Sequence, residues 1–87
     1  MADQRLTQEQ RNQVLDIIVA ELKDKKHRSF QQLFMKVNRI LGFEPNDHKA
    51  PGYRATDNAL QILRRRGFIR WFRFGTYRLW ELVPTEN

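Results

Sequence analysis

The sequence predicts an α+β domain in which three helices precede a small antiparallel β-sheet. Two stretches begin with a capping-box pattern and continue with apolar residues at helical spacing. A third helical stretch ends at Gly67, and residues 68 to 83 are rich in aromatic and long apolar side chains around Gly75. The chain has 87 residues, of which 40% are hydrophobic, so it suffices for a single core and a single domain.

The first helix is expected to start at Gln8, because Thr7 and Gln10 form a capping-box pattern. The basic run at residues 23 to 28 ends it, since cations suit the negative end of a helix dipole. Residues 1 to 6 are expected to form a flexible amino terminus, residues 7 to 83 the folded domain, and residues 84 to 87 a tail. Glu21 is assigned to the polar side, and the predicted core residues of this helix are Val14, Leu15, Ile17, Ile18, Val19 and Leu22.

Ser29 and Gln32 repeat the capping-box pattern and predict a second helix, which Gly42 ends as a left-handed cap. Residues 43 to 51 contain two prolines and several turn-forming residues, so they are expected to form a loop. Pro51 begins the third helix, because proline at the first helical position sacrifices no hydrogen bond. The predicted core residues of the second helix are Phe30, Leu33, Phe34, Val37, Ile40 and Leu41.

The third helix, residues 51 to 66, has two different faces. Its core face contains Thr56, Ala59, Leu60 and Leu63, with Tyr53 at the edge. Gly67 ends the helix, and Phe68 is expected to pack back on its last turn. The opposite face is a polar arc of roughly 60° that contains Arg54, Asn58, Gln61 and Arg65.

These four residues belong to three types, arginine, asparagine and glutamine, that recognise base edges. Arginine can make two hydrogen bonds to guanine, and asparagine or glutamine can make two to adenine. The face is therefore either a base-reading surface or an ordinary solvated helix face, and the sequence leaves both interpretations open.

Positive charge is concentrated in the second half of the chain. Residues 49 to 80 contain eight basic residues against Asp57 alone, a balance of +7 in a chain whose net charge is +6. Such a concentration is typical of proteins that bind polyanions, although it also favours solubility. The eight residues are Lys49, Arg54, Arg64, Arg65, Arg66, Arg70, Arg73 and Arg78.

The two predicted strands carry aromatic residues on both faces. Strand alternation separates Trp71 from Phe72 and Phe74, and in the return strand it separates Trp80 from Tyr77. Either a third strand or a folded tail buries both faces, or Phe72, Phe74 and Trp80 form a homodimer or partner surface.

Several classes of chemistry have no signal in the sequence. The chain has no cysteine, so it contains neither a disulfide nor a thiolate zinc site. His27 and His48 lack metal-ligand spacing, and no glycine-rich nucleotide motif occurs. We therefore expect no enzymatic activity, cofactor, metal or small-molecule substrate. No apolar run approaches a membrane span, so a cytoplasmic protein without a membrane partner is expected.

The segments ALQILRRRGFIRW (residues 59 to 71) and GTYRL (residues 75 to 79) resemble the ending common to the winged helix-turn-helix superfamily. The resemblance extends over roughly residues 8 to 83, and the amino-terminal DNA-binding domain of Mrr-type restriction endonucleases shares this pattern. It implies three helices and a two- or three-stranded β-wing, a double-stranded DNA partner, and a role in transcription regulation. It also implies that helix 51 to 66 enters the major groove, while Arg70, Arg73 and Arg78 meet phosphates or the minor groove.

Two other partner classes stay open. The segment FQQLFMKVNRILGF (residues 30 to 43) is similar to the amino-terminal domain of the bacterial RNA polymerase delta subunit, which implies a protein-binding adaptor or inhibitor. Structured RNA is a third class, although the A-form major groove is too narrow for a helix. DNA binding predicts that Arg54, Asn58, Gln61 and Arg65 matter most. A protein partner predicts Phe72, Phe74 and Trp80 instead.

Overall fold

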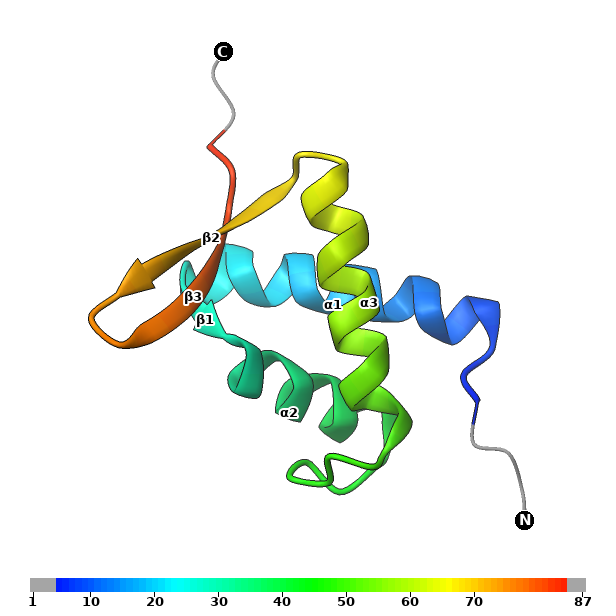
Figure 1. Ribbon diagram of the computed structural model, residues 1–87. Helices are drawn as coiled ribbons and strands as arrows, with labels where there is room; N and C mark the ends of the chain where they lie inside the picture. The colour runs from blue at the N-terminus through cyan, green and yellow to red at the C-terminus, as the bar shows by residue number, and fades with distance from the viewer. Residues whose placement is uncertain (1–4, 85–87) are drawn as a thin grey trace.

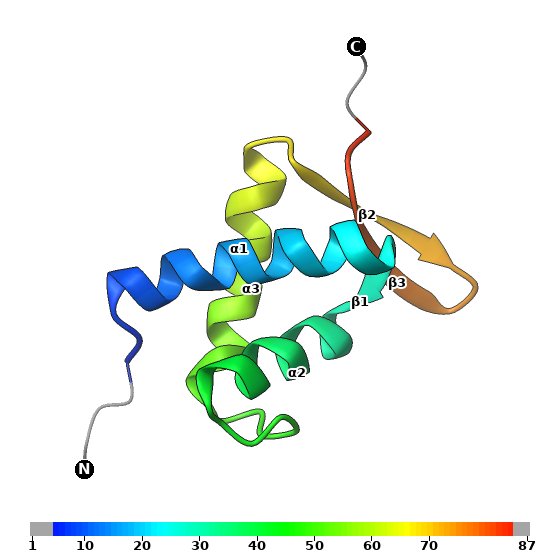
Figure 2. The same ribbon diagram turned by 180° about the vertical axis from the view of Figure 1, so that it is seen from behind.

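The structure, a computed structural model, describes residues 5 to 84 and has three helices and a three-stranded antiparallel sheet. The predicted α+β class is therefore confirmed. In Figures 1 and 2, α3 crosses α1 and the β2–β3 hairpin projects beyond the helices on one side. Residues 1–4 and 85–87, which belong to the predicted amino terminus and tail, lie outside the described residues. The elements are α1 (Gln8–Lys25), β1 (Arg28–Ser29), α2 (Phe30–Leu41), α3 (Pro51–Arg65), β2 (Ile69–Phe74) and β3 (Tyr77–Leu82).

Both predicted capping boxes are present, which explains where α1 and α2 begin. Thr7 Oγ1 accepts a hydrogen bond from the Gln10 amide at 3.1 Å, and Gln10 Oε1 accepts one from the Thr7 amide at 2.9 Å. Ser29 and Gln32 exchange the same two bonds at 3.2 and 2.9 Å. The predicted glycine stops are confirmed as well: Gly42 follows α2 with φ 87°, and Gly67 follows α3 with φ 79°.

The sheet has the order β1-β3-β2, so the carboxyl-terminal strand is central. β3 pairs along its whole length with β2, and Trp80 lies opposite both Trp71 of β2 and Arg28 of β1. A third strand is thus present, but it does not bury both faces of the hairpin. Trp80 is buried, with 5% of its surface exposed, whereas Phe74 on the opposite face is 67% exposed.

The core lies between the three helices and the inner face of the sheet. The side chains of Ile69 and Trp80 close it from the sheet side. The other members of this apolar cluster are Leu6, Val14, Ile18, Leu22, Leu33, Val37, Ala59, Leu60 and Leu63.

Three expectations about apolar side chains are wrong. Leu6 belongs to the segment expected to be flexible but is packed in the core, and its carbonyl accepts a hydrogen bond from Arg11 Nη2 at 3.1 Å. Ile40 is 45% exposed, because it lies at the edge of the apolar stripe of α2. Phe68 is 56% exposed: its backbone bonds to Leu63 and Val83, while its side chain stays in solvent.

Asn38 of α2 and Gly52 of α3 lie in close contact. A Cβ atom on Gly52 would collide with Oδ1 of Asn38, so only glycine lets the start of α3 lie against this side chain. Asn38 is fully buried, and its Nδ2 donates to the carbonyls of Pro45 and Asp47 at 3.2 Å each. The Asn38 side chain therefore determines both the conformation of the loop before α3 and the position at which α3 starts.

Glu21 is buried, although its sequence position assigned it to the polar side of α1. Its Oε2 lies 2.9 Å from Nε of Arg28 in β1, and its Oε1 lies 3.9 Å from Nζ of Lys36 in α2. A buried carboxylate requires such partners, because removal from water is costly for an unpaired charge. The pairing joins α1, β1 and α2 at one end of the molecule.

We expect Gly52→Ala to lower the free energy of unfolding by about 1 to 3 kcal/mol, because the added methyl group overpacks the contact with Asn38. Urea denaturation followed by circular dichroism measures this loss. In the Asn38→Ala background the obstructing amide is gone and only the backbone nitrogen at position 38 remains close, at 3.3 Å, so the same substitution should cost much less. An equal loss in both backgrounds would contradict the role assigned to this contact.

Candidate nucleic-acid interface

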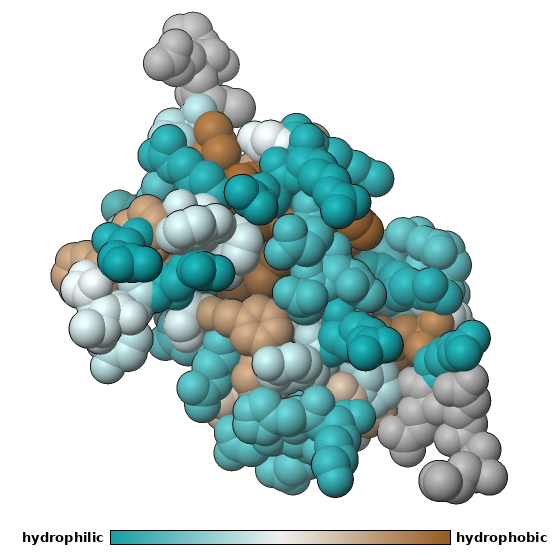
Figure 3. Space-filling view, in the orientation of Figure 1, coloured by the Kyte–Doolittle hydropathy of each residue, from teal (hydrophilic) through white to brown (hydrophobic). Residues whose placement is uncertain are grey.

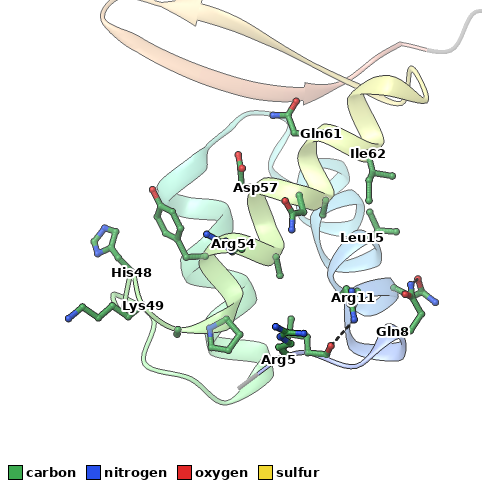
Figure 4. A pocket seen from close by; sticks show the side chains of 18 of the residues that line it. Arg5, Gln8, Arg11, Leu15, His48, Lys49, Arg54, Asp57, Gln61 and Ile62 are labelled. Atoms are coloured by element: carbon green, nitrogen blue, oxygen red, sulfur yellow. Dashed lines mark hydrogen bonds between the residues drawn. The ribbon is translucent and has the colours of Figure 1, made fainter. Parts of the chain in front are cut away.

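The outward face of α3 is the polar arc predicted from the sequence. Arg54, Asn58 and Arg65 are exposed, and Gln61 is half-buried. This orientation follows from the opposite side of the helix, where Thr56, Ala59 and Leu60 are packed in the core. All four polar residues line one open groove on the surface. Figure 4 shows Arg54 and Gln61 in this groove.

The second wall of this groove comes from α1 and the residues before it. Gln8, Arg11, Asn12 and Leu15 lie at helical spacing along one stripe, and Arg5 extends the same wall. In Figure 4, Leu15 and Ile62 lie toward one end of the groove, whereas Arg5 and Arg11 lie toward the other. None of these α1 residues is among the predicted site residues, although their three- and four-residue spacing was a signal that could have revealed the wall.

Aromatic rings hold the amino-terminal end of α3. The Tyr53 ring centroid lies 4.9 Å from those of Phe30 and Phe34 of α2. His48 from the loop completes the group, 5.2 Å from Phe34 and 5.4 Å from Tyr53. Edge-to-face and tilted rings at such distances add to the stability of packing beyond simple burial. The first turn of α3, with Arg54 on its outer side, is thereby anchored to the protein.

The other predicted basic residues near α3 are divided between the groove and the carboxyl-terminal end of the helix. Lys49 lines the groove near the start of the helix. Arg64 and Arg66 are exposed at its carboxyl-terminal end but are not part of the groove lining. Viewed from the side on which α3 is in front, hydrophilic side chains dominate the surface (Figure 3).

The arginines of the hairpin have contrasting surroundings. Arg70 lies opposite Glu81, and its Nε is 2.7 Å from the carboxylate. Arg73 instead lies directly opposite Arg78, and both are exposed. Like charges in facing positions of an antiparallel pair are destabilising. The Arg78 guanidinium also stacks over Trp71, 4.3 Å from the ring centroid.

The three aromatic residues proposed for a partner surface are separated by the structure. Trp80 is a core residue and cannot belong to an exposed surface, because the hairpin directs it toward the helices. Phe72 is half-buried and packs edge-on against His27, with 5.0 Å between the ring centroids. Phe74 alone of the three is largely exposed, together with Tyr77, which the prediction omitted.

Within residues 5 to 84, no group of three or more histidine, cysteine or acidic side chains could hold a metal ion. Asp47, adjacent to His48, uses its Oδ1 to accept a hydrogen bond from the Lys49 amide at 2.9 Å, as is common in turns. Among the described helices, none is both long and apolar enough to cross a membrane.

Comparison of the chain with protein-family models, curated proteins and solved structures finds no match.

Two substitutions in β2 should have opposite effects on stability. Arg73→Thr removes the repulsion with Arg78 and should raise the free energy of unfolding by about 0.2 to 1 kcal/mol, whereas Arg70→Thr removes the pairing with Glu81 and should lower it by a similar amount. Urea denaturation at low ionic strength measures both changes. Both should shrink in 1 M salt, which screens exposed charges. Changes of the same sign would contradict this description of the hairpin.

Proposed function

We propose that the chain is a winged helix-turn-helix protein that binds double-stranded DNA, with α3 as the recognition helix and the β2–β3 hairpin as the wing. The order of helices and strands supports this proposal, as does the short strand β1 beside β3. A helix of 15 residues is about 22 Å long, and B-DNA has a major groove wide enough for it.

The observation that carries the proposal is the composition of the exposed face of α3. Its side chains can satisfy the distinct donor and acceptor patterns of the major groove: Arg54 and Arg65 suit guanine, and Asn58 and Gln61 suit adenine. Because the core face of the helix is buried, these side chains face outward without any rearrangement of the fold.

The hairpin supports the proposal through its unfavourable charge pair. Arg73 and Arg78 repel each other in the free protein, and a phosphate group near both would relieve this repulsion and release counterions. Arg70 is less suited to that role, because Glu81 already holds its guanidinium.

The wall formed by α1 extends the proposed contact. Gln8, Arg11 and Asn12 carry hydrogen-bond donors at one side of the groove in which the α3 face lies. Amide and guanidinium groups commonly contact phosphate oxygens, and such contacts fix the orientation of a protein on the duplex without reading the sequence. We assign α1 this positioning role.

A protein partner is the second candidate function, and one observation favours it. Phe74 and Tyr77 are exposed side by side in the hairpin register, as in a partner-binding surface. Burial of Trp80 removes the largest ring from that surface, so we rank this function below DNA binding.

Two adjacent arginines of α3 offer a matched test of base reading. On a preferred site selected from random duplexes, Arg65→Ala or Asn58→Ala should weaken binding by about 1 to 3 kcal/mol and relax the sequence preference. Arg64 lies outside the proposed reading face. Arg64→Ala should therefore weaken binding to all DNA sequences alike. Fluorescence anisotropy on the selected site and on a scrambled duplex measures these changes.

Arg73→Ala provides the backbone control for the same assay. It should weaken binding to both duplexes equally and reduce the slope of log affinity against log salt by about one. Identical losses from Arg65→Ala and Arg64→Ala on both duplexes would contradict base reading by α3.

A further inference from the structure

We propose that the tip of the β2–β3 hairpin is a stacking platform for unpaired bases, formed by Phe74 and Tyr77. This inference rests on the proposed DNA binding and specifies the substrate further. The preferred ligand would be a duplex with an adjoining unpaired segment, such as a fork or a single-stranded arm.

The first observation is the exposure and position of the two rings. Phe74 and Tyr77 are 67% and 68% exposed, and they face each other across the hairpin in the last pair before the turn. Facing side chains in an antiparallel pair have Cβ atoms about 4.5 to 5.5 Å apart and project from the same side of the sheet. Among the described residues, neither of the two rings is in contact with another aromatic ring.

Folding does not account for these rings. The base of the hairpin holds the sheet to the core through Ile69 and Trp80, which are 2% and 5% exposed. The tip extends beyond the helices (Figure 1), so its outer side chains bury little surface in the folded chain. Two large exposed rings at one place are a feature of recognition surfaces.

The charge of the hairpin tip selects the kind of partner. Residues 71 to 79 contain Arg73 and Arg78 and no acidic residue. Arg73 and Arg78 form the facing pair next to the rings, so they project from the other face of the tip. The acidic residue nearest in sequence, Glu81, is already engaged by Arg70 at 2.7 Å and by His27 at 3.3 Å. A complementary ligand therefore combines negative charge with flat apolar faces. Nucleotides have this combination, and aromatic rings with neighbouring cations bind them by stacking whatever the base.

Away from the ends of a duplex, only unpaired bases offer their faces to these rings. Each interior base of a duplex is stacked between its neighbours, and extrusion of one costs a few kcal/mol, a cost that is smallest where the base is already unpaired. Intact duplex would thus engage Arg73 and Arg78 but leave Phe74 and Tyr77 in water. A duplex with an adjoining single strand would offer phosphates to Arg73 and Arg78 on one face of the tip and an unpaired base to Phe74 and Tyr77 on the other.

The test compares a blunt duplex with the same duplex carrying a single-stranded arm, by fluorescence anisotropy. Wild-type protein should bind the armed duplex at least about fivefold more tightly, the effect of stacking one base on one ring. The double variant Phe74→Ala/Tyr77→Ala should lose this advantage and keep its affinity for blunt duplex within about twofold. Phe68→Ala, which removes an exposed ring outside the tip, should keep the advantage.

A second measurement needs no substitution. With 2-aminopurine in the arm beside the duplex, wild-type protein should change the fluorescence as the base stacks on the tip, whereas 2-aminopurine inside the duplex should change little. No change at the arm would overturn the proposal. Retention of the arm preference by Phe74→Leu/Tyr77→Leu would also overturn it, because leucine has no ring on which a base can stack.

The remaining outcomes separate this inference from the proposed function. Equal binding of wild-type protein to both DNAs would overturn the stacking platform but leave duplex binding intact. Failure to bind either DNA at low salt would overturn both. Binding to phosphatidylserine vesicles that the double variant loses, without any arm preference, would assign the tip to a membrane surface instead.

Discussion

The contact between Gly52 and Asn38 determines where α3 lies, and the rest of the candidate interface depends on it. Asn38 is fully buried and holds two carbonyls of the loop before α3, while the absence of a side chain on Gly52 lets the helix start against it. Rings from α2 and the loop then hold Tyr53. With its apolar face fixed in this way, α3 must present Arg54 and Arg65 to solvent, along one wall of a groove.

Electrostatics divide the molecule into two parts. Around β1, the buried carboxylate of Glu21 is paired with Arg28 and lies near Lys36. The charged groups there compensate one another and connect elements of the fold. On α3 and at the hairpin tip, cations greatly outnumber carboxylates, and the facing pair of Arg73 and Arg78 opposes folding. A polyanion would turn this unfavourable arrangement into a favourable one. That reversal is the physical reason for connecting the hairpin with DNA.

Local signals in the sequence predicted the helix starts and stops, because the capping boxes at Thr7 and Ser29 and the stop at Gly42 involve neighbours only a few residues apart. The polar face of α3 followed from its periodicity in the same way. The burial of Asn38 could not be predicted, since its partners are backbone groups of a loop without periodicity. The two-residue strand β1 and the burial of Trp80 likewise depend on contacts between distant parts of the chain. The spacing of Gln8, Arg11 and Asn12 predicts a polar stripe on α1. That this stripe lies beside the polar face of α3 depends on how the two helices pack, which local spacing does not determine.

The most direct test of the central claim, that α3 and the hairpin form one DNA-binding face, is an NMR titration of the protein with a random-sequence duplex at two salt concentrations. The account predicts amide shifts centred on residues 54 to 65 and 70 to 78, with smaller shifts at the start of α1, all weakening steeply as salt rises. Shifts confined to the β1 end of the molecule, or no shifts at low salt, would contradict it.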